Sequence, residues 1–153
     1  MWFTPSEDTI KTRISGPELN ALKSAARAQG LNTDTIITAA LSRIVQMIRG
    51  YVGSKHTLGA EGTIPDELES ALGALWLVEF ITRIPASGKL LDEARRKAAE
   101  DAMTLLKDVA SGRFAIVPPT SPAPEAAQAG GPKIQLVSSS TRIGHDLRSS
   151  GLF

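Results

Sequence analysis

The clearest pattern of apolar and polar positions lies between about residues 33 and 52. Apolar side chains recur there at steps of one, three and four over about five turns, which predicts a helix with one face against a core. Asn32 or Thr33 is the expected N-cap. The predicted inward stripe is Ile36, Ile37, Ala40, Leu41, Ile44, Val45, Ile48 and Val52. The opposite, solvent-facing side is expected to carry Thr35, Ser42, Arg43, Gln46 and Arg49.

A second long helix is predicted to begin at Pro65. A proline at a first helical position needs no N–H partner, and the acids that follow favour the positive end of the helix dipole. Between residues 71 and 81 this helix is apolar almost all round, which is typical of the element in the middle of a small bundle. Its expected inward positions are Leu68, Ala71, Leu72, Leu75, Trp76 and Phe80.

A third long helix is predicted from about Leu90 to Ser111, ended by Gly112. Its expected buried positions are Leu91, Ala94, Ala98, Ala102, Leu105, Leu106 and Val109. Small residues at 94, 98 and 102 would let a neighbouring helix approach closely. The opposite face is interpreted as solvated and carries Glu93, Arg96, Lys97, Glu100, Asp101 and Lys107.

Two short helices are predicted before these three. Ser6 is an N-cap candidate for the first, and Gly16 followed by Pro17 ends it and starts a second, which runs to about Ala28 and is capped by Gly30. The fold class expected is therefore all-α, a compact bundle of about five helices. Three are long, and the two short N-terminal ones are expected to close one end.

The C-terminal quarter of the chain has a different composition. Residues 1–117 hold the helical patterns of the core, residues 118–132 form a Pro, Ala and Gly linker, and residues 133–153 form an arm. Residues 133–138 are β-prone, so the arm is expected to dock on another chain by adding a strand to a sheet edge, with the last side chain in a pocket. A solvated tail without structure is the alternative. The predicted partner-binding residues are Ile134, Leu136, Val137, Arg142, Ile143, Leu147, Arg148 and Phe153.

Composition and charge narrow the class of protein. The 153 residues suit one domain plus an appendage, and 42% hydrophobic residues suffice for a core. A formal charge of +1 does not provide the field of a dedicated nucleic-acid binder, and the absence of cysteine excludes disulfides and thiolate sites. No signal-peptide pattern or apolar run of about 18 residues is present, so we expect a soluble protein made in the cytoplasm.

No combination of residues predicts catalysis, a metal site or a cofactor. His56 and His145 are single histidines outside any metal-ligand spacing. The acids at 66, 67 and 69 are explained by the helix dipole better than by acid–base chemistry. Glu79 lies on the most apolar helix, and we expect it to pair with Arg83 or with a residue of a neighbouring subunit.

A helix-turn-helix remains an alternative for residues 19–44, because two helices flank a turn at Gly30. The helix that would read bases begins Thr33-Asp34-Thr35, with no arginine, asparagine or glutamine aimed at base edges near its start. A helical DNA-binding regulator is therefore kept as the second hypothesis for function, and an enzyme is not expected.

The order of several segments resembles the Mu-type bacteriophage head-tail connector family. The resemblance lies in I-V-Q-M-I-R-G-Y-V at 44–52, a loop, and then I-P-D-E-L-E-S-A-L at 64–72. The ending L-K-D-V-A-S-G at 106–112 is similar to the family's L-x-D-I-A-x-G, and 141–148 is similar to its arginine-rich terminus. K-H-T-L-G at 55–59 departs from the Y-x-L-P-L type of run found in the family loop.

The resemblance implies a structural adaptor of the virion neck, assembled in the host cytoplasm. Such a subunit would form a ring of about twelve copies through two different faces. Its partners would be further copies of itself, the portal protein, and a tail, tail-terminator or stopper protein. DNA would pass through the axial channel without sequence-specific binding, and no membrane would be involved.

Overall fold

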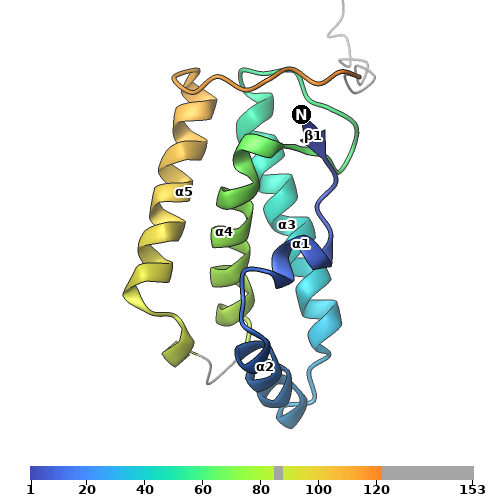
Figure 1. Ribbon diagram of the computed structural model, residues 1–153, viewed down its shortest axis with the longest axis vertical. Coiled ribbons are helices and arrows are strands. Elements are labelled where there is room, and N and C mark those ends of the chain that lie inside the picture. The colour runs from blue at the N-terminus through green and yellow to red at the C-terminus, as the bar shows by residue number, and fades with distance from the viewer. Residues whose placement is uncertain (85–87, 122–153) are drawn as a thin grey trace, which may run out of the picture.

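Three long helices, α3 (Thr33–Gly53), α4 (Glu69–Thr82) and α5 (Glu93–Ser111), form the body of the molecule (Figure 1). The computed structural model describes residues 1–84 and 88–121. Each long helix contacts the other two, so the core lies where the three meet. The five α-helices within these residues confirm the predicted all-α fold.

α4 is the central helix, as its sequence predicts. All six of its expected inward positions are buried, Leu68 among them in the short 3-10 turn η1 (Asp66–Leu68) that leads into the helix. The rings of Trp76 and Phe80 stack with centroids 4.9 Å apart, and both side chains are fully buried. Aromatic side chains of this size bury more apolar area than any other, so the pair anchors the core.

α3 also follows its predicted pattern, since every position of the inward stripe is buried except Ile36, which is half-buried. Asn32 is the N-cap, and its side-chain oxygen accepts hydrogen bonds from the amides of Asp34 and Thr35. Of the predicted solvent-facing residues, four are exposed and Arg49 is half-buried.

α5 begins at Glu93, after the N-cap Asp92 and the short turn η2 (Gly88–Leu90). The predicted face of this helix is buried only in its C-terminal half. Ala102, Leu106 and Val109 are buried as expected, whereas Ala94 and Ala98 are exposed and Leu91 and Leu105 are half-buried. Alanine gains little from burial, so the larger side chains decide which face turns inward. The predicted close helix approach at 94 and 98 is therefore wrong.

The two short helices occupy different places. α1 (Glu7–Lys11) lies against α3 and α4, and α2 (Gly16–Ala28) covers the end of the bundle away from the N-terminus (Figure 1). Only α2 therefore closes an end, because α1 lies along the side. α2 is fixed by a capping box between Ser15 and Glu18, and Glu18 also binds Arg95 of α5 at 2.8 Å.

A small antiparallel ladder joins the N-terminus to the segment before α4. Strand β1 (Trp2–Phe3) pairs with β2 (Ile64–Pro65), and the amide of Asp66 donates to the carbonyl of Met1 at 2.9 Å. Pro65 thus lies in a strand at the point where the sequence predicted a helix start, because a proline needs no ladder partner at such an edge. A Cβ at Gly59 would come within 2.7 Å of the Trp2 ring, so glycine is required where this ring packs on the loop.

Candidate functional site: the chain exit and the α3 groove

All eight predicted partner-binding residues of the arm, from Ile134 to Phe153, lie outside the described residues. The structure does describe the segment through which the chain leaves the core. We call residues 112–121 the strap. Gly112 ends α5 with φ of 78°, the left-handed conformation that favours glycine, and the strap then crosses the end of the bundle toward β1 (Figure 1).

The strap is held at Val117 by both of its backbone polar groups. The indole Nε1–H of Trp2 donates to the Val117 carbonyl at 2.8 Å, and the Val117 amide donates to Glu67 Oε1 at 3.3 Å. Ile116, next to it, is buried in the core, whereas the Val117 side chain is exposed. The chain therefore starts toward the linker and arm from a fixed point beside β1. The pattern of helices contained no signal for this clamp.

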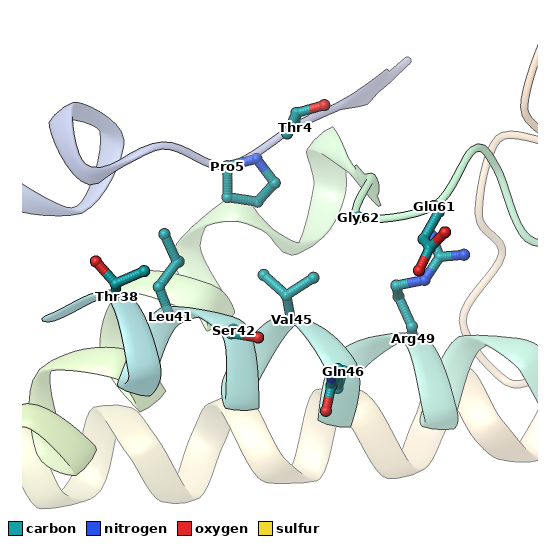
Figure 2. Close-up of a pocket in the computed structure, with 10 residues that line it drawn as sticks. All are labelled: Thr4, Pro5, Thr38, Leu41, Ser42, Val45, Gln46, Arg49, Glu61 and Gly62. Atoms are coloured by element: carbon teal, nitrogen blue, oxygen red, sulfur yellow. The ribbon is translucent and has the colours of Figure 1, made fainter. Parts of the chain in front are cut away.

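A groove runs along α3 beneath the N-terminal segment (Figure 2). Leu41 and Val45 point into it from α3, and Pro5 faces them from the other side (Figure 2). We call this hollow the α3 groove, and its lining is Thr4, Pro5, Thr38, Leu41, Ser42, Val45, Gln46, Arg49, Glu61 and Gly62. Its floor is apolar and its rim is polar. The sequence did not predict this hollow, because its walls come from three separate segments.

Arg49 fixes the loop that forms one end of the groove. Its guanidinium donates to the carbonyls of Thr63 at 2.6 Å, Ala60 at 2.9 Å and Gly59 at 3.2 Å. A guanidinium presents several N–H donors in a fixed plane, so one side chain can serve three acceptors in one loop. The loop thus keeps its shape without a hydrophobic core of its own.

Thr38 and Glu7 fix the other end of the groove. The Thr38 hydroxyl lies 3.0 Å from Glu7 Oε1, and Glu7 forms an ion pair with Lys11 at 3.0 Å. The hydrogen bond from Lys11, and then that from Thr38, lower the pKa of Glu7, and the same carboxylate raises the pKa of Lys11. The hydrogen bond between Thr38 and Glu7 attaches α1 to α3, and the ion pair within α1 holds the Glu7 carboxylate in place.

The carboxylates singled out in the sequence each have a separate partner. Asp66 lies 3.5 Å from the N-terminal amino group, Glu67 holds the strap, and Glu69 lies 4.0 Å from Arg13. The three acids lie in the first turns of η1 and α4, and they also contact the N-terminus, the strap and the Arg13 side chain. Each of the three carboxylates contacts a different group, and no two of them share a partner in these contacts.

Glu79 pairs with Arg83, as predicted. Its Oε1 accepts from Arg83 Nε at 2.8 Å and Nη2 at 2.7 Å, and it also lies 3.4 Å from Arg43 of α3. Both arginines belong to the same chain, and together they neutralise the Glu79 carboxylate on the most apolar helix.

His56 is half-buried in the loop after α3, whereas His145 lies outside the described residues. Within 1–84 and 88–121, no three histidine or carboxylate side chains are grouped to hold a metal. In the same part of the chain, no helix combines the length and hydropathy required to cross a membrane. In the suspected helix-turn-helix, Asn32 is used as a cap and the first turn of α3 carries the acid Asp34.

Residues 6–134 match the family model for bacteriophage Mu, Gp36. The chain belongs to the bacteriophage Mu Gp36 family. The match covers every helix described here, the strap, and the linker as far as the first residues of the arm. No curated protein and no solved structure matches the chain.

Membership of the Gp36 family confirms the predicted resemblance at the level of a Mu-type phage protein, and points to a structural protein associated with the phage particle. Within this family, the described chain is a helical body with a clamped exit beside β1 and a groove along α3.

Proposed function

We propose that this Gp36-family protein is a head-tail connector subunit of the virion neck. In this proposal, copies assemble in the host cytoplasm into a ring between the portal and the tail, and DNA passes through the axis. The match of residues 6–134 to the phage family carries the proposal. The protein would act by assembly alone, without catalysis or a cofactor.

The clamp at Val117 supports a docking role for the arm. An arm that starts from a fixed point on a folded body searches a smaller volume than one that starts from a loose end, which raises its effective concentration near a partner bound by that body. The two hydrogen bonds from Trp2 and to Glu67 provide such a point. The arm would then dock on the portal protein, a neighbouring subunit or a tail protein.

The exposed side of α3 supports passage of DNA without tight binding. Thr35, Ser42 and Gln46 are exposed there and carry no charge. The two cations beside them already have partners within the subunit, since Arg43 lies 3.4 Å from Glu79 and Arg49 donates to the loop carbonyls. Affinity for DNA depends mainly on cations that can neutralise phosphates, so we expect this side of α3 to bind DNA weakly.

Deletion of residues 133–153 tests the docking role. We expect the truncated protein to keep the helical circular dichroism spectrum and the cooperative unfolding of the full chain but to fail to join portal-containing particles. A matched control replaces 118–132 by a Gly/Ser linker of the same length, which should preserve attachment. Normal attachment of the truncated protein would show that the arm is dispensable.

A DNA titration separates the connector from a DNA-binding regulator. Filter binding over a range of salt should show weak binding with a shallow salt dependence. Tight binding with a steep salt slope would favour the regulator. Negative-stain images of the assembled protein should show rings, and particles lacking this subunit should have heads without attached tails.

A further inference from the structure

We propose that the α3 groove holds the start of the chain's own arm, residues 133–137, while the subunit is unassembled. The occupant would be an extended segment with Lys133 at the loop end of the groove, Ile134 over Val45 and Leu136 over Leu41. This inference goes beyond the neck role, because it concerns the free subunit and does not depend on which partner later binds the arm.

The chemistry of the groove fits that segment. Its floor is formed by Leu41 and Val45, which keep 9% and 8% of their surface exposed, and Pro5 faces them across the open hollow (Figure 2). Side chains two residues apart on an extended segment project to the same side with a spacing of about 6.6 Å. Residues four apart on a helix are separated by about 6 Å along its axis. Ile134 and Leu136 therefore match the pitch of the floor.

Charge sets the direction of the segment. Glu61 is exposed and stands at the same end of the groove as Arg49, whose guanidinium is already occupied by the loop carbonyls (Figure 2). An acid at this end complements Lys133, the residue that opens the arm. A segment that enters beside Glu61 runs antiparallel to α3.

The exit of the chain lies at that same end. Trp2 donates its indole N–H to Val117, and its ring packs on Gly59, two residues before Glu61. The described chain continues to residue 121, and residues 122–132 can span up to about 36 Å when extended. The groove between Thr38 and Arg49 is about 17 Å long, so the arm can reach its whole length.

A tether this short gives the arm of the same chain an advantage over the arm of another copy. Linkers of this length produce effective concentrations of about millimolar, above that of a free subunit in dilute solution. Covering Ile134 and Leu136 would keep apolar, β-prone residues away from other copies until a partner takes them. Assembly would then require release of the arm from the groove.

Introduced cysteines test the inference directly, because the natural chain contains none. In the full-length protein, Gln46→Cys and Ile134→Cys place one thiol at the groove and one at the arm position expected over Val45, on the side of the segment that faces α3. The control pairs Ile134→Cys with Lys107→Cys, since Lys107 is exposed on α5 and does not line the groove. Oxidation under mild conditions at low protein concentration is followed on non-reducing gels.

We expect an intramolecular disulfide between positions 46 and 134 that forms at least about ten times faster than the control bond. Leu136→Asp, added to the groove pair, should reduce that rate to the control value. Glu61→Lys should slow it about two- to fivefold, and adding Lys133→Glu should restore it. All variants are compared by circular dichroism to verify that the core is folded.

Two results would overturn the inference. Equal rates for the groove and control pairs would mean that the arm does not occupy the groove. Disulfide-linked dimers as the main product would assign the groove to the arm of another copy. Neither result bears on the neck role, because attachment to portal-containing particles is measured separately with the deletion of 133–153.

Discussion

Arg49→Ala should loosen the loop that forms the end of the α3 groove and destabilise the protein by about 2 to 4 kcal/mol. The wild-type guanidinium donates to three loop carbonyls, two of these bonds being part-buried and one exposed. Hydrogen bonds to charged groups contribute about 1.5 to 3 kcal/mol each, and water replaces them in part where the acceptors become exposed. The part-buried bonds to Thr63 and Gly59 therefore account for most of the loss.

Urea unfolding followed by circular dichroism measures this effect, and hydrogen exchange of the loop amides locates it. Arg49→Lys should recover part of the stability, since one ammonium cannot reach three carbonyls in the fixed geometry of a guanidinium. Arg43→Ala is the matched control on the same helix. Its side chain is 69% exposed and Glu79 retains Arg83, so we expect a loss below about 1 kcal/mol. Similar losses for the two alanine variants would refute the role assigned to Arg49.

Three further predictions follow from the packing, the ion pairs and the helix ends. Trp76→Ala should cost about 3 to 5 kcal/mol in urea unfolding, because it removes a fully buried ring stacked on Phe80; a loss below about 2 kcal/mol would contradict its place in the core. The hydrogen bond from Arg95 lowers the pKa of Glu18 in the folded protein. The stability from this pair is therefore present above pH 4.5 and is lost as the pH falls through the lower folded pKa. The difference in unfolding free energy between wild type and Glu18→Gln should shrink below pH 4.5, and a constant difference would argue against the pair. Gly112→Ala should destabilise the protein by about 1 kcal/mol, because alanine is strained at a φ of 78°. Gly30→Ala, at a φ of 69° at the end of α2, should cost about the same and is the matched variant.

The helices could be predicted from the sequence wherever large apolar side chains set the period. The stripe on α3 and the inward face of α4 rest on isoleucine, leucine and aromatic residues, whose burial is worth enough to fix the face of the helix. On α5 the pattern depended on alanines, and the structure places Ala94 and Ala98 in solvent. Alanine gains little from burial, so a pattern of alanines could not fix the inward face of the N-terminal half of this helix.

The groove and the clamp could not be predicted from periodicity, because both depend on contacts between distant segments. The ladder of β1 and β2 has only two residues on each side, too few to show an alternating pattern. The clamp uses the backbone N–H and C=O of Val117, which every residue except proline possesses. Its sequence signals are the tryptophan at position 2 and the acid at position 67, and neither specifies a partner.

Trp2 connects the loop at the end of the groove to the strap through which the chain leaves the core. Its backbone pairs with β2, its ring packs on Gly59 of the loop, and its indole N–H holds Val117. Arg49 attaches the same loop to α3 through carbonyls on either side of Glu61. The origin of the arm is therefore connected through one side chain to the loop that forms the end of the groove. A change at Trp2 that removes the hydrogen bond but keeps the ring packing, such as Trp2→Phe, should thus alter where the arm starts while leaving the groove in place. In the cysteine assay it should slow formation of the disulfide between positions 46 and 134 without changing the unfolding of the helices. An unchanged rate would mean that the clamp does not direct the arm.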